Sequence, residues 1–167
     1  MSSPPFTIRV ATGLADIPAA DWNACAADAD GHVDPFLDHA FFLSLEESGS
    51  AVRATGWLGH HLVLERAGRI EAILPCYLKS HSRGEYVFDA GWAEAYERAG
   101  RRYYPKLQAS VPFTPATGRR LLVRPGPEAD MVRTALVQGD AQVTVQAGVS
   151  SLHVTFCRHD EWELMAA

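Results

Sequence analysis

The 167-residue sequence contains no apolar run that approaches the roughly 20 residues needed for a membrane-spanning helix. Its first residues, Met1–Pro5, lack both the positive charge and the apolar core of a secretory signal peptide. The net charge of −5 also lacks the basic excess of a general nucleic-acid-binding protein. From these absences we expect a cytoplasmic protein with no membrane span.

Metal-binding and disulfide patterns are missing as well. The three cysteines are far apart and no CxxC pair occurs, which excludes a zinc ribbon and a thioredoxin-type site. His60 and His61 are adjacent in a predicted strand, so their side chains point to opposite faces and do not share an ion. No HExxH pattern occurs. We therefore predict reduced thiols and no metal site.

Common catalytic and nucleotide-binding signatures are also absent. The sequence has no GxSxG elbow of a serine hydrolase, and neither the GxGxxG nor the GxxxxGK[ST] loop. Cys76 lies in an apolar predicted strand, where a free cysteine is usually a small buried hydrophobic residue and not a nucleophile. The function therefore lies outside these motif classes.

The residues that are present indicate one α/β domain over residues 1–167. Hydrophobic residues make up 47% and charged residues 21% of the chain, which is typical of a folded domain. Alternating apolar residues predict a strand at 6–11, and apolar runs predict strands at 57–65, 70–78, 106–111, 121–123 and 151–156. Helix-spaced apolar residues and helix-start signals predict helices at about 16–26, 34–47, 92–99, 127–137 and 160–165. Residues 57–78 read as a hairpin, in which Pro75 indicates an edge or a bulge.

The end of the chain leaves its last predicted helix incomplete. Trp162 and Leu164 are apolar residues of an element that has nothing after it to cover them. A domain usually ends in a polar linker beyond its last element. We therefore expect the chain to be a fragment of a longer protein.

The candidate functional region is residues 77–120. After an apolar strand the sequence becomes abruptly polar at residues 79–86, and Asp89, Trp92 and Tyr96 follow. Pockets that orient a polar ligand combine aromatic, acidic and basic side chains in this way. The alternative is a solvated loop whose aromatic residues fill the core beneath it.

A second candidate segment, residues 112–120, leaves a predicted strand and precedes a helix. Its hydroxyl groups, glycine and two arginines suit an anion, because backbone N–H groups and guanidinium groups bind phosphate oxygens. The alternative is an ordinary turn with exposed arginines.

Several segments resemble those of a known family. They are DPFLDHAFFLSLEESGS (34–50), GHHLVLE (59–65), LPCYLKSHSRGEYVFD (74–89), GWAEAYERAGRRYYPKLQASVPFTPATGRRLL (91–122) and SSLHVTF (150–156). The chain resembles the bacterial FemAB-like proteins, which are often described as peptidoglycan-biosynthesis or GNAT-family acetyltransferase proteins. The resemblance covers most of residues 34–163.

The resemblance implies a GNAT-like fold, with a mixed, mostly antiparallel sheet flanked by helices. It implies two such domains in tandem, of which this chain would be the N-terminal one. The implied activity is transfer of an acyl group from acyl-CoA, or of an amino acid from aminoacyl-tRNA, to the amine of a small molecule or peptide. The Q/R-x-x-G-x-G/A loop by which ordinary GNAT enzymes bind acyl-CoA is absent, so the donor stays open.

Amide-forming transfer would give the candidate residues specific roles. Glu85 and Asp89 are the expected base or amine-orienting groups, with His81 third, and Tyr104 is a proton donor or pocket wall. The residues expected to bind substrate are Lys79, Tyr86, Trp92, Tyr96, Tyr103 and Lys106. The residues expected to hold the donor phosphate are Thr114, Thr117, Gly118, Arg119 and Arg120. The alternatives are a non-catalytic substrate-binding half-domain and an inactive truncated fragment.

Overall fold

The computed structural model describes residues 4–166 and contains helices and strands in an α+β arrangement, as predicted. The strands form two four-stranded sheets that are mostly antiparallel. The first sheet has the order β1 (Phe6–Ala11), β3 (His61–Arg66), β4 (Arg69–Leu74), β7 (Leu122–Val123). The second has the order β2 (Trp57–Gly59), β5 (Cys76–Lys79), β6 (Lys106–Ala109), β8 (Leu152–Val154), with β6 and β8 parallel.

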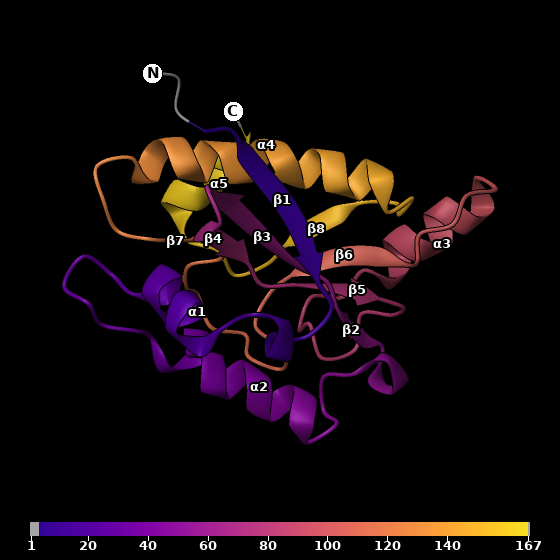
Figure 1. Cartoon of the computed structure of the whole chain (residues 1–167). Coiled ribbons are helices and arrows are strands. Elements are labelled where there is room, and N and C mark those ends of the chain that lie inside the picture. Colours follow the sequence, from indigo (N-terminus) through magenta and orange to yellow (C-terminus); the bar gives the residue numbers. More distant parts are fainter. Residues whose placement is uncertain (1–3, 167) are drawn as a thin grey trace.

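Helices cover both faces of the first sheet (Figure 1). The helices are α1 (Ala19–Ala26), α2 (His39–Glu47), α3 (Ala90–Arg98), α4 (Ala129–Gln146) and α5 (His159–Ala166). Leu62 and Leu64 pack in the same apolar cluster as residues of α4, whereas Val63 packs with residues of α1. Because strand side chains alternate between faces, Leu62 and Leu64 are buried on one face of β3 and Val63 on the other.

The predicted hairpin exists, but each of its two strands is divided. The ladder between β3 and β4 belongs to the first sheet, whereas β2 and β5 pair in the second. The divisions fall at His60 and Pro75, and the His60 N–H donates to the Cys76 carbonyl at 2.9 Å. Proline has no N–H for a ladder, so the chain leaves one sheet at Pro75 and enters the other.

The single helix predicted for residues 34–47 is wrong, because the structure has two elements there. Asp34 caps the short 3₁₀ helix η2 (Pro35–Leu37) by accepting the Phe36 N–H. Asp38 is extended and caps α2 by accepting the Ala40 N–H at 2.8 Å. Each aspartate favours the start of its own helix, so the chain bends between them.

Helix α4 is longer than predicted, since it continues through residues 138–146. Val132, Leu136, Asp140 and Val143 are buried at helical spacing, so packing on the sheets outweighs the poor helix propensity of this stretch. Gly139 permits the close approach, because a Cβ atom there would lie 1.9 Å from Ile8 Cδ1.

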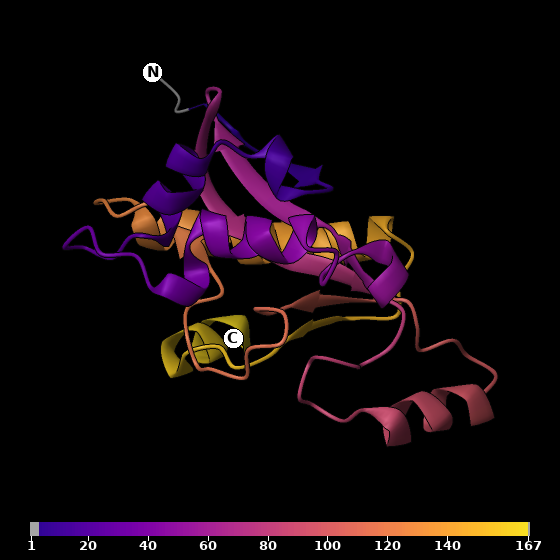
Figure 2. The same ribbon diagram turned by 90° about the horizontal axis from the view of Figure 1, so that it is seen from below.

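Helix α3 stands apart from the other helices. Figure 2 shows it at the periphery, away from α1, α2 and α4, and none of its residues is buried. In α5, Trp162 is 56% exposed and stacks on His159, whereas Leu164 packs partly against the core. None of the described helices is both long and apolar enough to cross a membrane.

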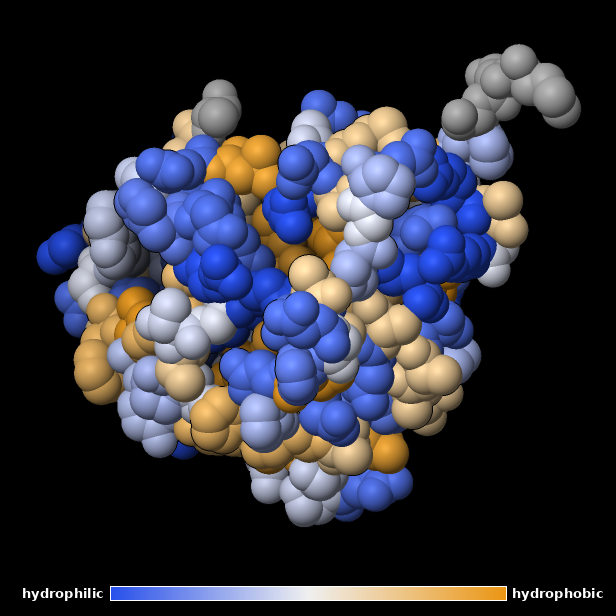
Figure 3. All heavy atoms as spheres, turned by 90° about the vertical axis from the view of Figure 1, so that its left-hand side faces the viewer, coloured by the Kyte–Doolittle hydropathy of each residue, from blue (hydrophilic) through white to orange (hydrophobic). Residues whose placement is uncertain are grey.

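Exposed hydrophobic residues are gathered near α3. Phe88 and Trp92 are 92% and 68% exposed. Figure 3 shows a different face, the left side of Figure 1, where hydrophilic residues cover much of the surface and hydrophobic ones form small separate groups. Phe88 and Trp92 thus expose two large aromatic side chains just before and within α3.

Candidate functional site

One face of the second sheet carries a row of buried polar side chains. On β6 and just after it, Lys106, Gln108 and Ser110 occupy alternate positions and are almost fully buried. Lys79 is paired with Lys106 and Tyr77 with Gln108 across the β5–β6 ladder, which places them on the same face. The intervening Leu107 and Ala109 belong to the opposite, apolar face. A polar face buried beneath loops is unusual, because unpaired polar groups cost free energy there.

A charge network lies at the end of this row. The Lys106 ammonium group is 2.8 Å from Glu85 Oε2 and 2.6 Å from Asp89 Oδ2. The hydroxyl groups of Tyr103 and Tyr104 donate to the Asp89 carboxylate at 3.0 and 2.6 Å. None of Lys106, Glu85 and Asp89 is more than 3% exposed. This network joins β6 to the loop that precedes α3.

Lys79 extends the network toward Trp57. Its ammonium group is 3.9 Å from Glu85 Oε1, donates to the Arg83 carbonyl at 3.1 Å, and lies 3.5 Å from the centroid of the Trp57 ring. Burial lowers the pKa of Lys79 to about 8, although Glu85 opposes the shift. Lys79 and Lys106 are the only two lysines of the sequence, so every lysine of the chain lies in this site.

The two carboxyl groups differ in proton affinity. Burial raises the pKa of Asp89, but hydrogen bonds from Lys106 and Tyr104 outweigh it and hold that pKa well below its usual range. At Glu85 burial dominates and raises the pKa, although Lys106 opposes it. Glu85 Oε1 also has no hydrogen-bond partner among the described residues. Glu85 is therefore better suited than Asp89 to accept a proton.

The two tyrosines are held in their protonated form. Burial and then the hydrogen bond to Asp89 raise the pKa of Tyr104 to about 12, and the pKa of Tyr103 rises for the same reasons. A hydroxyl group that donates to a carboxylate gives up its proton less readily. Their geometry therefore suits orientation of Asp89 better than proton donation.

Two cavities flank the network. One, of about 350 Å³, is lined by Lys79 and Tyr104 among others. The other, of about 340 Å³, is lined by Asp89 and Tyr103 together with Trp92 of α3. Both are within the size range of small ligand pockets, and each reaches a member of the network.

Comparison with known protein families decides the family. A family model described as FemAB-like, peptidoglycan biosynthesis/recognition, matches residues 13–167. The chain belongs to the FemAB-like family. No curated protein and no solved structure matches it.

Most of the predicted catalytic and substrate-binding residues of this FemAB-like chain lie together. Those brought into or beside the network are Lys79, Glu85, Asp89, Tyr103, Tyr104 and Lys106. Trp92 and Tyr96 line the cavity beside Asp89. Tyr86 is instead 55% exposed, and His81 lines a different cavity.

The predicted phosphate-binding segment uses its donors internally. The buried Arg120 guanidinium donates to the carbonyls of Ala116, Arg119 and Thr155, and Arg119 donates to the Ala26 carbonyl. The Glu161 carboxylate accepts the N–H groups of Arg120 and Leu121.

The other residues predicted to bind phosphate are Thr114, Thr117 and Gly118. Thr114 donates to the Pro112 carbonyl, the Gly118 N–H donates to the Phe156 carbonyl, and Thr117 is exposed. The Glu161 carboxylate therefore occupies the backbone N–H groups of a segment that was expected to bind an anion. The predicted phosphate role gains no support from these contacts.

Three polar residues of the second sheet and its edge, Gln108, Ser110 and His153, were not predicted from the sequence. Gln108 Oε1 and Ser110 Oγ are buried without a partner among the described residues, and His153 Nε2 is 3.5 Å from the Tyr103 hydroxyl. Lys106, Gln108 and Ser110 alternate with apolar residues in a strand that was assigned to the core. This period-two pattern is the signal that identifies a polar face.

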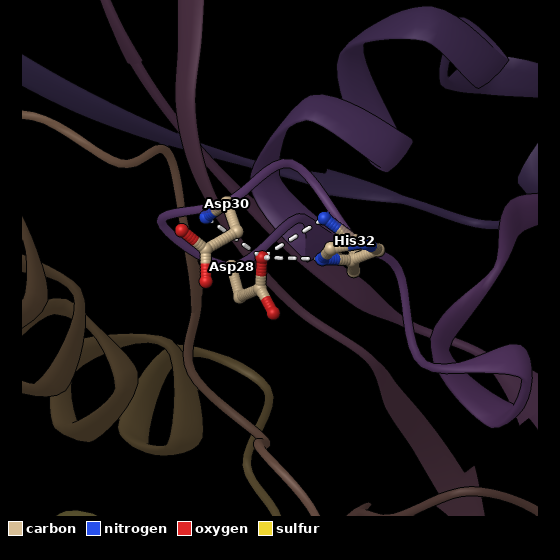
Figure 4. A group of neighbouring side chains, drawn as sticks. All are labelled: Asp28, Asp30 and His32. Carbon is tan, nitrogen blue, oxygen red and sulfur yellow. Dashed lines mark hydrogen bonds and ion pairs between the residues drawn. The ribbon is translucent and has the colours of Figure 1, made fainter.

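Among the described residues, Asp28, Asp30 and His32 form a group with metal-like spacing (Figure 4). All three are exposed, and Asp28 Oδ1 accepts the backbone N–H groups of Asp30 and His32 at 2.9 Å. The Asp28 carboxylate thus orders its own loop, as in an Asx turn. We assign it no metal-binding role.

Proposed function

We propose that this FemAB-like chain takes part in transfer of an acyl or aminoacyl group to an amine in cell-wall peptide metabolism. The family supports the peptidoglycan context. The observation that carries the proposal is the buried network of Lys106, Glu85 and Asp89 between two cavities. Charged groups arranged in this way shift proton affinities, and such shifts are concentrated at functional sites.

In the proposed reaction Glu85 is the base. The acceptor amine attacks the donor carbonyl, a C–N bond forms, and the bond to the donor thiol or hydroxyl oxygen breaks. Glu85 takes the proton that the amine loses, since its pKa is raised and Oε1 is an unused acceptor. The proton returns to the leaving group, directly or through water.

Asp89 has a positioning role in this proposal. It holds the Lys106 ammonium at 2.6 Å, which in turn holds Glu85 at 2.8 Å. Tyr103 and Tyr104 fix the Asp89 carboxylate from the other side. The donor is acyl-CoA or aminoacyl-tRNA, both of which are available in the cytoplasm.

The test compares two conservative variants in the protein encoded by the complete gene. Acetyl-CoA and aminoacyl-tRNA are each supplied with a stem peptide bearing a free amine, and the amide product is followed by mass spectrometry. We expect Glu85→Gln to lower turnover at least about 100-fold, as for loss of a general base. Asp89→Asn is expected to lower both turnover and thermal stability, since it weakens the hold on Lys106.

The matched control is Glu94→Gln, because Glu94 is an exposed glutamate of the adjacent α3. It should transfer at the wild-type rate. Wild-type turnover by folded Glu85→Gln would remove Glu85 as the base. Its circular dichroism spectrum and Tm establish whether it is folded.

A second candidate function is recognition of a peptidoglycan peptide without transfer. It is favoured by the burial of Glu85, which is only 3% exposed and, unlike Asp89, lines neither of the two flanking cavities. Saturable binding of the stem peptide with no product from either donor would support this second function.

A further inference from the structure

A third cavity lies on the side of Trp57 and Arg83 and has no part in the proposed transfer. Its volume is about 580 Å³, and its apolar lining includes Leu45, Trp57 and Phe113. The polar lining includes Arg83 and His81, and no acidic side chain contributes. The cavity therefore combines an apolar interior with a positive rim.

Two side-chain donors that line this cavity, the Arg83 guanidinium and the Trp57 indole N–H, have no acceptor among the described residues. Arg83 is exposed, and the ion pairs formed within residues 4–166 leave it out. Trp57 is fully buried, yet its indole N–H has no partner among the described residues. His81 Nδ1 accepts the Arg83 N–H at 3.2 Å, so the neutral imidazole carries its proton on Nε2. A negatively charged group rich in acceptor atoms would accept hydrogen bonds from Arg83 and Trp57.

The walls of the cavity depend on unusual backbone conformations. Gly56 has φ +79°, and a Cβ atom there would lie 2.3 Å from His81 Nε2. Gly84 has φ +80°, and its carbonyl accepts the N–H of Phe113, which itself has φ +59°. A large residue with positive φ is strained, and such strain is concentrated at ligand sites.

We propose that this cavity binds a small organic anion. A phosphate or carboxylate group would lie at the Arg83 guanidinium and the Trp57 indole N–H, and an apolar or aromatic body would pack against Leu45 and Phe113. Guanidinium groups suit both kinds of oxyanion. Trp57 lines this cavity while Lys79 lies over its ring, so the site adjoins the Lys106 network without sharing its carboxylates.

The test follows the Trp57 indole N–H signal by NMR, assigned by triple-resonance spectroscopy in the purified chain. Four probes with one ring are titrated separately: phenyl phosphate, benzoate, benzyl alcohol and benzylammonium. We expect both anions to shift the Trp57 signal saturably, whereas the neutral and cationic probes leave it unchanged at the same concentration. The anion with the lower Kd identifies phosphate or carboxylate as the preferred group.

Arg83→Gln supplies the second arm of the test. It should raise the Kd of the better anion about tenfold, as expected for loss of a charge-assisted hydrogen bond. Arg102→Gln is the control, since Arg102 is also exposed but does not line the cavity. The proposal is overturned if no anion shifts the Trp57 signal, if Arg83→Gln binds as tightly as wild type, or if benzylammonium binds equally well. None of these outcomes depends on transferase activity, so this site and the proposed function fail separately.

Discussion

Replacement of Lys106 by methionine is expected to lower the free energy of unfolding by about 3–5 kcal/mol, because it leaves two buried carboxylates without their shared cation. Lys106 is 1% exposed and contacts both Glu85 and Asp89 at ion-pair distance. Methionine has a similar length, so the lost charge and not a cavity dominates the effect. Urea denaturation at pH 7, with two-state analysis, measures it.

A double-variant cycle separates charge from packing. Adding Glu85→Gln to Lys106→Met should recover part of the lost stability, because only one unpaired carboxylate then remains. Arg101→Met is the control and should change stability by less than about 0.5 kcal/mol, since Arg101 is exposed. Simple addition of the two single losses would contradict the network.

The second large effect concerns Asp140 on the opposite side of the second sheet. This carboxyl group is buried, Oδ1 has no partner among the described residues, and burial raises its pKa to about 7. The folded chain therefore binds this proton more tightly than the unfolded chain, whose carboxyl group has its ordinary pKa. The stabilising effect of the proton is complete below about pH 4 and is lost as the pH rises to 7.

Asp140→Asn should remove this pH dependence. A shift of roughly three units corresponds to about 4 kcal/mol, so above pH 7 the variant should be more stable than wild type by up to that amount. Near pH 4 the two should differ little. Urea denaturation at pH 4.5 and pH 8 measures the difference, with Asp130→Asn of the same helix as the exposed control. An advantage of equal size at both pH values would contradict this account of Asp140.

Local patterns were sufficient to predict most of the elements. Alternation predicted β1, and an apolar, β-branched run predicted the strand that contains β3. The apolar residues of α1, Trp22, Cys25 and Ala26, are buried as expected. The errors arose where contacts between residues far apart in the sequence determine the structure. Helix α4 continues past residue 137 because it packs on two sheets, and the predicted strands divide at His60 and Pro75 because the chain passes between sheets.

The same distinction applies to the site. Aromatic, acidic and basic residues of the 77–120 region are visible in the sequence, and the β5–β6 register brings Lys79 and Lys106 side by side. The sequence alone does not show that Lys106 binds two carboxylates from a loop. Nor does it show that Glu161, about 40 residues away, occupies the backbone N–H groups of Arg120 and Leu121. The charged residues can be found in the sequence, whereas the fold determines which of them form pairs.

The most direct test of the proposed site uses the scarcity of lysine in this chain. Protein labelled with ¹³C-lysine should give only two sets of lysine side-chain Hε–Cε signals, from Lys79 and Lys106. A stem peptide with a free amine is titrated while calorimetry follows its binding. We expect both lysine signals to shift as the peptide saturates, and N-acetylation of its amine to weaken the shift. Saturable binding that leaves both lysine signals unchanged would contradict the proposed site.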